Sequence, residues 1–524
     1  MVSMKRTYVL DAVQDWADRT PDATALREAE RTRTYEDLVG RARRMASAIS
    51  AAARPDDVAV GFLGKNSIEF YEVWLGANIA DYAIAPLNWR SPAAELATLI
   101  DAARLSVVVA DAAHDATLAD VRNLLARDLT VISFDATSAD TPYEARIASS
   151  SPLARHAVDG AAIALLTHTS GTTGQPKGAT FSHDAFRNAI RWTQEEPSMR
   201  CGSDDVALMV MPNFHLAGSW VSLPALYYGG TIAILPAFEP NAVLKALREW
   251  GVTTVCLVPT AIQFLLSHPE IHEADFGALR SILYAGSPIS AQVLQEALDV
   301  FQCELIQFYG ATETYMISIL RPEQHDPSRP NLLTSCGNPL PGVSVRFVGK
   351  KGKDKEAGEI GEILVASDVM FGEYYENPEQ TAAARDGEWY RTGDLGFVDE
   401  EGNIHLVDRA KDMIVTGGEN VYSVEVERAL LSHDSVTSAA VVGAPDSQWG
   451  ERVVAFVTLA PGAEATEAEL KAHTRARIAG YKVPKQVRII DAMPLTASGK
   501  IQKVVLRDRV RAEEGEQAHA ESAV

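Results

Sequence analysis

Short apolar runs alternate with amphipathic stretches along the first part of the chain. Residues 58–63 and 82–87 are apolar runs of strand length, and residues 68–80 between them have the length and pattern of a helix. The same alternation recurs at 106–110, 130–134, 161–167, 206–211, 231–235, 254–258 and 281–285, with helical stretches such as 241–250 between them. Strands that alternate with helices predict an α/β fold with largely parallel, doubly wound sheets.

The pattern changes after about Asn338. Residues 338–407 form a run of short strands dense in Gly, Pro and charged residues, which predicts a β-rich subdomain with a solvated hairpin tip at 350–355. A smaller α+β unit follows, with a glycine turn at 413–418, helices at 423–431 and 467–478, and strands near 437–442 and 453–459. We therefore expect a large domain at 1–409 and a small C-terminal domain at 410–524.

Length and composition agree with a soluble protein of at least two domains. The chain has 524 residues, 47% of them hydrophobic and 23% charged, which is too long for one ordinary core. Its net charge of −22 argues against a general nucleic-acid binder, because phosphate contacts need clustered Lys and Arg. We expect no signal peptide, no transmembrane segment and a cytoplasmic location. The thiols of Cys201, Cys256, Cys303 and Cys336 lack metal-ligand spacing and are expected to be reduced.

One polar loop stands out between a strand and a helix. The segment Thr169-Ser170-Gly171-Thr172-Thr173-Gly174-Gln175-Pro176-Lys177-Gly178 follows the apolar run 161–167 and precedes a helical stretch that begins near Ser182. Its glycines permit close approach of the backbone to an anion, while its hydroxyls, amides and Lys177 can bind phosphate oxygens. A Walker loop is excluded because Lys177 is followed by Gly178 rather than Ser or Thr. The alternative, a polar surface turn, would need ten such residues to occur in this order by chance.

This loop resembles the signature phosphate loop of the adenylate-forming superfamily, which includes acyl-CoA synthetases, luciferases and peptide-synthetase adenylation domains. Six further segments are similar to motifs of that family, in the same order: 211–215, 307–313, 390–394, 408–412, 417–420 and 498–500. The resemblance covers nearly the whole chain and points to the acyl-CoA synthetase, or fatty-acid–CoA ligase, branch. It implies ATP, Mg²⁺ and CoA as the small molecules bound.

The resemblance also carries roles over to individual residues. Lys500 would bridge the substrate carboxylate and the α-phosphate, Glu313 and Thr172 would hold Mg²⁺, and Thr172 and His215 would complete the catalytic set. Asp394 would accept hydrogen bonds from the ribose, with Arg409 as the second candidate there. Tyr309 would stack on adenine unless it only packs in the core. The full nucleotide-binding set implied is Thr169, Ser170, Gly171, Thr173, Gly174, Lys177, Gly286, Ser287, Tyr309, Gly310, Ala311, Thr312, Asp394 and Arg409.

Further residues would serve the transfer of the acyl group to a thiol. Family members rotate the small domain between two reactions, and Lys411 occupies the corresponding hinge position. Gly417, Gly418 and Asn420 would then line a channel for the pantetheine arm, although Gly-Gly before a helix is also an ordinary turn. His215 would be a gate between acid and thiol, or a satisfied histidine at a strand end. His168 departs from the family, which has an aromatic residue there.

The acid pocket is expected from Ala217, Gly218, Trp220, Tyr284 and Ala285. No charged residue appears in the segment after His215, which disfavours an amino acid and favours a fatty or aryl acid. Trp220 either shortens the pocket or faces the core. No carrier-protein module follows Lys500, so CoA is the expected acceptor.

A carboxylate cannot be attacked by a thiol until its oxygen becomes a good leaving group, which acyl-AMP supplies. The sequence therefore predicts an ATP-dependent carboxylic acid–CoA ligase that releases AMP and pyrophosphate. Two alternatives remain: a stand-alone enzyme that loads a carrier protein, and a catalytically silent nucleotide-binding protein. The expected partners are a small carboxylic acid and CoA, with a homodimer possible and no nucleic acid.

Overall fold

The computed structural model describes residues 7–135, 138, 141–169, 177–273, 276–287, 289–349, 352–446, 448–495 and 501–522. The chain divides into two compact units, here called unit 1 and unit 2. Unit 1 comprises Met1–Leu333, Gly337–Ser344 and Val365–Tyr390, and unit 2 comprises Thr334–Cys336, Val345–Leu364 and Arg391–Val524. The predicted α/β class, with a large N-terminal and a smaller C-terminal part, is confirmed. The domain boundary after Arg409 stays a prediction, because this division instead groups most of the β-rich segment with the C-terminal residues.

Unit 1 contains a six-stranded sheet whose first five strands are parallel. Its order is β6 (Thr130–Phe134), β5 (Val107–Asp111), β3 (Ala59–Leu63), β4 (Ala83–Leu87), β7 (Ile163–Thr169) and β8 (Lys177–Ser182). Strand β8 runs antiparallel to β7 and was not predicted from the sequence. Strands β3 and β4 are buried on both faces, which explains their unbroken apolar runs.

A nine-stranded sheet forms the other half of unit 1. Its order is β15 (Asn338–Pro339), β14 (Tyr315–Leu320), β13 (Glu304–Ala311), β12 (Ser281–Ala285), β11 (Thr254–Leu257), β9 (Val206–Met209), β10 (Thr231–Ile234), β1 (Thr24–Glu28) and β2 (Arg31–Thr34). Neighbouring strands from β13 through β1 are parallel, and β15, β14 and β2 pair antiparallel. The carboxyl ends of β12 and β13 are therefore neighbours, which places the segments after Ala285 and Phe308 together.

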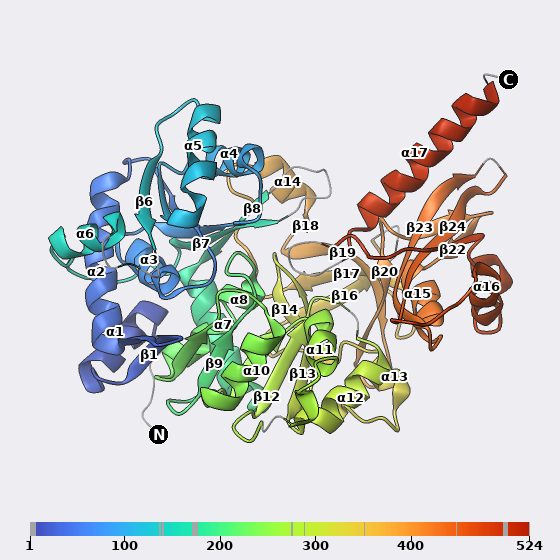
Figure 1. Cartoon of the computed structure of the whole chain (residues 1–524), viewed down its shortest axis with the longest axis horizontal. Helices are drawn as coiled ribbons and strands as arrows, with labels where there is room; N and C mark the ends of the chain where they lie inside the picture. Colours follow the sequence, from blue (N-terminus) through green and yellow to red (C-terminus); the bar gives the residue numbers. More distant parts are fainter. Residues whose placement is uncertain are drawn as a thin grey trace. The chain divides into compact units, whose positions relative to one another are not determined.

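Helices cover both faces of each sheet (Figure 1). Helices α2 (Tyr35–Ala52), α3 (Ile68–Ile79) and α7 (His183–Glu195) share a core with the facing sides of the two sheets. The outer face of the nine-stranded sheet packs on α10 (Pro240–Glu249), α11 (Pro259–Leu266) and α12 (Ala291–Phe301). The outer face of the other sheet packs on α4 (Ala93–Ala102) and α5 (Asp115–Leu124). Every residue of α3 is buried, as expected for a helix between two sheets.

Unit 1 contains further helices. They are α1 (Val9–Arg19), α6 (Pro142–Ser149), α8 (Leu216–Ser219), α9 (Leu223–Tyr227), α13 (Pro330–Leu333) and α14 (Pro378–Ala383). The predicted helical stretch after the phosphate loop is α7, which begins at His183. Its N-cap is Ser182, whose hydroxyl accepts a hydrogen bond from the Ala185 amide.

Two five-stranded sheets lie in the last third of the chain. The first has the order β16 (Ser344–Val348), β17 (Gly361–Ala366), β19 (Trp389–Val398), β18 (Arg385–Asp386), with β20 (Ile404–Arg409) also paired to β19. The second joins β22 (Glu419–Val421), β21 (Ile414–Thr416), β24 (Gly450–Leu459), β23 (Val436–Asp446) and β25 (Gln486–Ile489). Its helices are α15 (Ser423–Leu431), as predicted, α16 (Glu467–Arg475) and α17 (Lys503–Ser522).

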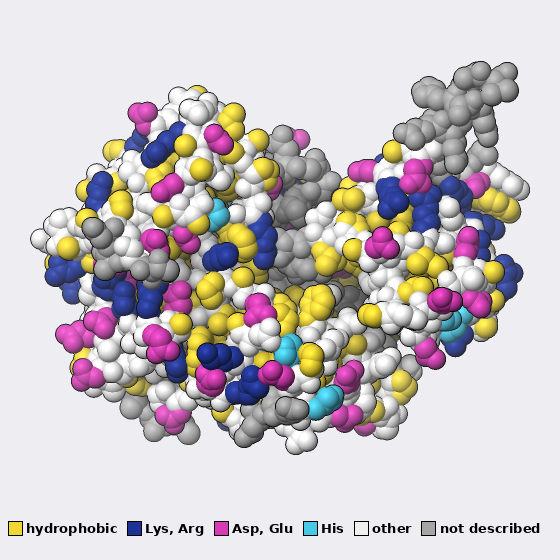
Figure 2. Space-filling view, viewed as in Figure 1, with side chains coloured by type: hydrophobic (Ala, Val, Ile, Leu, Met, Phe, Trp, Pro, Cys, Tyr) yellow, Lys and Arg dark blue, Asp and Glu magenta, His cyan; other side chains and the backbone are white. Residues whose placement is uncertain are grey.

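The surface and the cysteines agree with the composition. The face shown in Figure 2 carries acidic and basic side chains interspersed with apolar ones. Among the described residues, no helix combines the length and the hydropathy that crossing a bilayer requires. All four cysteines are free thiols, and burial raises the pKa of Cys256 and of Cys336 to about 12, so both remain protonated at neutral pH.

Candidate adenylation site

The two ends of the phosphate loop are adjacent in the fold. Thr169, the last residue of β7, pairs with Lys177, the first residue of β8, so the loop closes an antiparallel hairpin. The intervening candidates Ser170, Gly171, Thr172, Thr173 and Gly174 lie outside the described residues, as does Lys500. Their assigned roles therefore stay predictions.

The end of β7 also contacts the segment that carries His215. The hydroxyl of Thr167 donates to the Phe214 carbonyl at 3.4 Å, and the His215 amide donates to the Pro212 carbonyl at 3.0 Å. His215 is the N-cap residue of α8, and its ring centroid lies 4.6 Å from that of Phe214. The fold thus brings the predicted gate residue next to the strand that enters the phosphate loop.

His168 is a neutral histidine in this position. Burial lowers the pKa of His168 to about 4, so the imidazole is uncharged at neutral pH. Its Nδ1 atom has no hydrogen-bond partner within the part of the chain that the structure describes. A neutral ring at the edge of the phosphate loop adds no positive charge for ATP.

Glu313 lies in the tight turn between β13 and β14. Its side chain is buried, and its Oε1 atom accepts a hydrogen bond of 2.7 Å from the hydroxyl of Tyr374. Burial and the neighbouring Glu313 carboxylate raise the pKa of Tyr374 far above its usual range, so this hydroxyl keeps its proton and acts as the donor. The ammonium of Lys177 lies 4.8 Å from the centroid of the Tyr374 ring. Two predicted ATP-binding residues are thereby joined through a tyrosine that no motif indicated.

Two glycines shape the proposed adenine site. A Cβ atom on Gly310 would lie 1.8 Å from the Tyr315 carbonyl oxygen, so only glycine permits this turn. Gly286 has a φ of +95°, which other residues rarely adopt, and Ser287 follows it. Tyr309, Gly310 and Ala311 end β13 and Thr312 follows it, beside the segment that follows β12. Tyr309 is buried with 7% of its surface exposed, which suits either a stacking platform or core packing.

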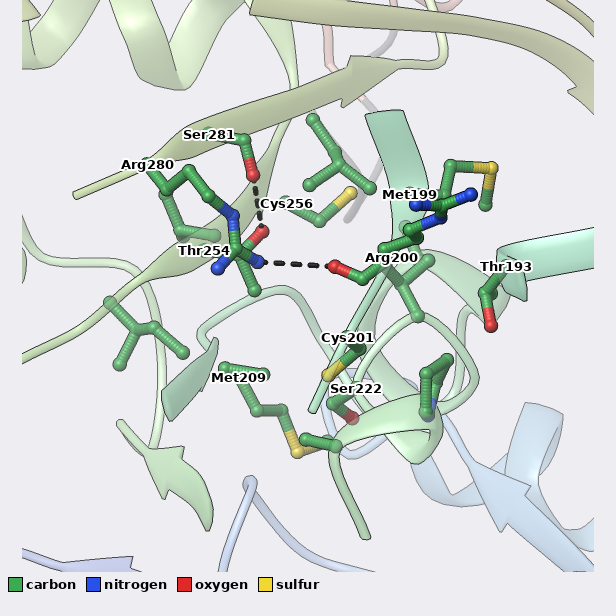
Figure 3. A pocket seen from close by; sticks show the side chains of 18 of the residues that line it. Thr193, Met199, Arg200, Cys201, Met209, Ser222, Thr254, Cys256, Arg280 and Ser281 are labelled. Atoms are coloured by element: carbon green, nitrogen blue, oxygen red, sulfur yellow. Dashed lines mark hydrogen bonds between the residues drawn. The ribbon is translucent and has the colours of Figure 1, made fainter. Parts of the chain in front are cut away.

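An apolar cavity of about 50 Å³ runs along the inner face of the nine-stranded sheet. Ala217 and Gly218 of α8, both predicted for the acid pocket, line it together with Met209, Cys256, Leu283, Tyr315 and Met316. Figure 3 shows Met209, Cys256 and Ser222 around this space. A Cβ atom on Gly218 would lie 2.2 Å from the Pro212 carbonyl oxygen, so the glycine lets α8 pack directly on the preceding backbone.

The cavity changes character at the amino ends of the strands. There the Ser281 and Thr254 hydroxyls are hydrogen-bonded at 3.0 Å, and the Arg280 guanidinium donates to the Arg200 carbonyl at 3.2 Å (Figure 3). Arg280 also forms an ion pair of 2.6 Å with Asp205. Both arginines line this end, whereas no Asp or Glu is among the described residues that line the cavity.

Three of the predicted pocket residues do not line this cavity. The Trp220 ring is fully buried between Phe186, at a centroid distance of 4.0 Å, and Tyr315, at 4.3 Å, so it faces the core and backs the cavity wall. Tyr284 packs in the core on the outer face of the sheet, where its hydroxyl is 2.9 Å from His325 Nε2. Tyr284 does not line this cavity, because side chains alternate along β12 and Leu283 takes the inner face. Ala285 packs against the core between the sheets.

In unit 2, the two ribose candidates form a pair. Asp394 of β19 and Arg409 of β20 are register partners, and Arg409 Nε lies 2.6 Å from Asp394 Oδ1. The Asp394 side chain is 8% exposed and that of Arg409 is 47% exposed. The sequence predicted both for the ribose but not that they would be paired.

The glycine segment of unit 2 is a two-residue β-hairpin turn. Gly417 and Gly418 join β21 to β22 and have φ values of +58° and +87°, as a type I′ turn requires. The Gly417 amide donates to the Trp449 carbonyl at 2.8 Å, and a Cβ atom on Gly417 would lie 2.8 Å from the Trp449 ring. Gly418 and Asn420 are exposed, and so is Lys411 in the turn after β20. A Cβ atom on Gly418 would meet nothing within 4 Å.

Comparison with known proteins identifies the family. The model for AMP-binding enzymes matches residues 13–375, and the model for the AMP-binding enzyme C-terminal domain matches residues 425–500. The chain therefore belongs to the AMP-binding enzyme family, in the acyl-CoA synthetase branch of the adenylate-forming enzymes.

Individual relatives align over almost their whole length. A feruloyl-CoA synthase from an Amycolatopsis species is 37% identical over 94% of this chain and 97% of its own. A fatty acid–[acyl-carrier-protein] ligase from Streptomyces coeruleorubidus is 34% identical over 94% of both chains. Among solved structures, ATP-bound MatB from Rhodopseudomonas palustris superposes with a TM-score of 0.87 at 29% identity, covering 96% of this chain and 99% of that one.

Proposed function

We propose that the protein is an ATP-dependent carboxylic acid–CoA ligase for an apolar fatty or aryl acid. The observation that carries this proposal is the cavity along the nine-stranded sheet, which adjoins the segments of His215 and Glu313 and has no acidic lining residue in the described chain. The ammonium group of an amino acid would find no carboxylate there, and burying an unpaired charge is costly. An apolar tail gains free energy from the same surroundings.

In the first half-reaction, a carboxylate oxygen of the acid attacks the α-phosphorus of ATP. The bond from that phosphorus to the bridging oxygen breaks, and pyrophosphate leaves with the bonding electrons. Lys177 and Lys500 would offset the negative charge on the phosphate oxygens, and Asp394 would fix the ribose. Such preorganised charges are the main source of catalysis in phosphoryl chemistry.

The residues around Glu313 fit a Mg²⁺ ion. Mg²⁺ is usually held by one or two carboxylates plus substrate phosphates rather than by a closed protein cage. Glu313 offers one buried carboxylate, and the described residues contain no group of three or more His, Cys, Asp and Glu side chains able to hold a metal. When bound, the ion neutralises charge on the phosphate oxygens. Thr172 would be the second protein ligand.

In the second half-reaction, the CoA thiol attacks the acyl carbon of acyl-AMP. The carbon–oxygen bond to AMP breaks, AMP leaves, and the thiol proton passes to solvent. The Gly417–Gly418 turn would present backbone without side chains to the pantetheine arm, and Lys411 would be the hinge that exchanges the two states of unit 2. The cytoplasmic location and the homodimer likewise stay predictions.

A CoA-dependent AMP-release screen tests the function. The purified protein is incubated with MgATP, CoA and fatty, phenylpropenoid, benzoic and amino acids in separate reactions. We expect AMP release with at least one apolar acid and none above background with amino acids. Release only with amino acids, or with no acid at all, would contradict the proposal.

Carrier-protein loading is the second candidate function. It is favoured by one observation, the 34% identity to a ligase whose stated acceptor is an acyl-carrier protein. Replacing CoA with a phosphopantetheinylated carrier protein in the same assay separates the two acceptors. Faster transfer to the carrier than to free CoA at equal thiol concentration would favour this alternative.

A further inference from the structure

Tyr374 belongs to none of the motifs, yet it touches two residues proposed to bind MgATP. Its hydroxyl donates to Glu313 Oε1 at 2.7 Å, and its ring face lies 4.8 Å from the Lys177 ammonium. The tyrosine is buried with 3% of its surface exposed. One side chain therefore connects the metal carboxylate with the lysine at the exit of the phosphate loop.

The backbone around Tyr374 is tied to the same two places. The Phe371 amide donates to the Glu313 carbonyl at 2.8 Å, and the Tyr375 amide donates to the Gly178 carbonyl at 2.7 Å. Between them, Thr180 of β8 exchanges hydrogen bonds of 3.0 and 3.1 Å with the backbone of Glu373. These contacts hold the tyrosine in place between β8 and the turn of Glu313 before any ligand binds.

We propose that Tyr374 is a positioning residue, which orients the Glu313 carboxylate for the divalent cation that accompanies ATP. This inference rests on the proposed function, because it takes Glu313 as the metal ligand. The hydroxyl engages Oε1 and thereby fixes the plane of the carboxylate. Because the hydroxyl is neutral, the negative charge of Glu313 stays available to a cation. An arginine or lysine in the same place would offset that charge.

The ring has a second part in this arrangement. Its face attracts the Lys177 ammonium electrostatically, which restrains a flexible side chain at the start of β8. Removing only the hydroxyl should therefore affect the metal, whereas removing the whole ring should affect both the metal and the nucleotide. This difference allows the two contacts to be tested separately.

Metal binding is measured directly rather than through turnover. Free Mn²⁺ is followed by electron paramagnetic resonance during titration of the full chain with a non-hydrolysable ATP analogue bound. For Tyr374→Phe we expect Mn²⁺ to bind about 10- to 100-fold more weakly, the usual cost of losing a partner that orients a metal ligand. The matched control is Tyr375→Phe, which removes a hydroxyl from the neighbouring ring and should leave Mn²⁺ affinity unchanged.

A double-mutant cycle distinguishes positioning from a general structural role. On a Glu313→Gln background, the further change Tyr374→Phe should have no additional effect on Mn²⁺ affinity, because the group it acts through is gone. Equal losses on both backgrounds, or unchanged affinity in Tyr374→Phe, would overturn the proposal. If Tyr374→Phe proves unstable, Tyr374→His keeps a ring and a donor, and should retain more Mn²⁺ affinity than Tyr374→Leu.

Failure of this inference is separable from failure of the proposed function. If the wild type shows Mn²⁺-dependent nucleotide binding but no acid-dependent AMP release, the function is wrong while Tyr374 can still be tested. If AMP release is present and Tyr374→Phe has the metal affinity of the wild type, the inference alone is wrong.

Discussion

Two buried carboxylates among the candidate residues, Glu313 in unit 1 and Asp394 in unit 2, have partners of different charge. Glu313 accepts from the neutral hydroxyl of Tyr374, whereas Asp394 pairs with the guanidinium of Arg409 at 2.6 Å. A neutral donor leaves the carboxylate charge uncompensated, and a guanidinium largely offsets it. The first arrangement suits a divalent cation, and the second suits the neutral hydroxyls of a ribose.

The difference shows how the same chemical group can serve either a cation or a sugar, depending on its partner. A buried carboxylate without a counter-ion destabilises the folded state, so Glu313 lowers the stability of the fold unless a cation binds. Asp394 carries its own counter-ion and needs the ligand only as a hydrogen-bond donor. Removing the charge should therefore reduce activity more at Glu313 than at Asp394.

Glu313→Gln should have the largest effect on adenylation. The amide keeps the size of the side chain but cannot hold a divalent cation well, so adenylation should slow about 100- to 1,000-fold. Acid-dependent exchange of pyrophosphate into ATP measures this step. Thioester formation from supplied acyl-AMP should stay within about 3-fold of wild type, since that step involves no pyrophosphate. A similar loss in both half-reactions would remove Glu313 from the metal role.

Asp394→Asn should raise the KM for ATP about 10- to 100-fold, because hydrogen bonds to a charged group contribute about 1.5–3 kcal/mol. The kcat at saturating ATP should change little, since the ribose is bound in ground state and transition state alike. Steady-state kinetics over a range of ATP concentrations provide the measurement. A fall in kcat with unchanged KM would show that Asp394 does not bind the ribose.

His168 differs from both carboxylates, because its Nδ1 atom has no hydrogen-bond partner among the described residues. Its pKa of about 4 in the folded state lies below that of an unfolded histidine, so the unfolded chain takes up the proton first as the pH falls. The folded state should lose about 2 kcal/mol between pH 7 and pH 5 from this residue. His168→Phe should lose correspondingly less, measured by urea unfolding at both pH values. Equal losses for both proteins would indicate that His168 is not buried in solution.

Arg409→Gln should have the smallest effect. The arginine is about half exposed, so its ion pair contributes at most about 1 kcal/mol, which limits the rise in the KM for ATP to about 5-fold. The effect should shrink in 0.5 M salt, because screening weakens exposed pairs. A larger loss than that of Asp394→Asn would mean that Arg409, rather than Asp394, binds the ribose.

Much of the fold was predictable because its strands and helices have distinct periods and lengths. Helix α15 was predicted at its observed bounds, and most strands of unit 1 within two residues. Strand β8 was missed because it lies inside the polar phosphate-loop segment, where a nucleotide motif masks the strand pattern. The extent of β23 and β24 was underestimated, since their ends are polar and pair beyond the buried stretch.

Faces of a buried strand were harder to predict. Strand β12 is apolar on both sides, so its sequence holds no alternation to show that Tyr284 takes the outer face and Leu283 the inner one. Trp220 follows α8 and has no local signal that separates the cavity from the core. Tyr374 was missed for another reason: it lies far from Glu313 along the chain, and only tertiary contact relates them.

All described residues that line the cavity proposed for the acid lie from Thr193 to Met316 in the sequence. Under this proposal, acid selectivity is encoded in one uninterrupted stretch of the gene, separate from the glycine hairpin proposed to receive the thiol. Recombination with a relative at the two ends of that stretch would exchange one preference and leave the other in place. The two ends of this stretch are therefore natural junctions for building chimeric ligases.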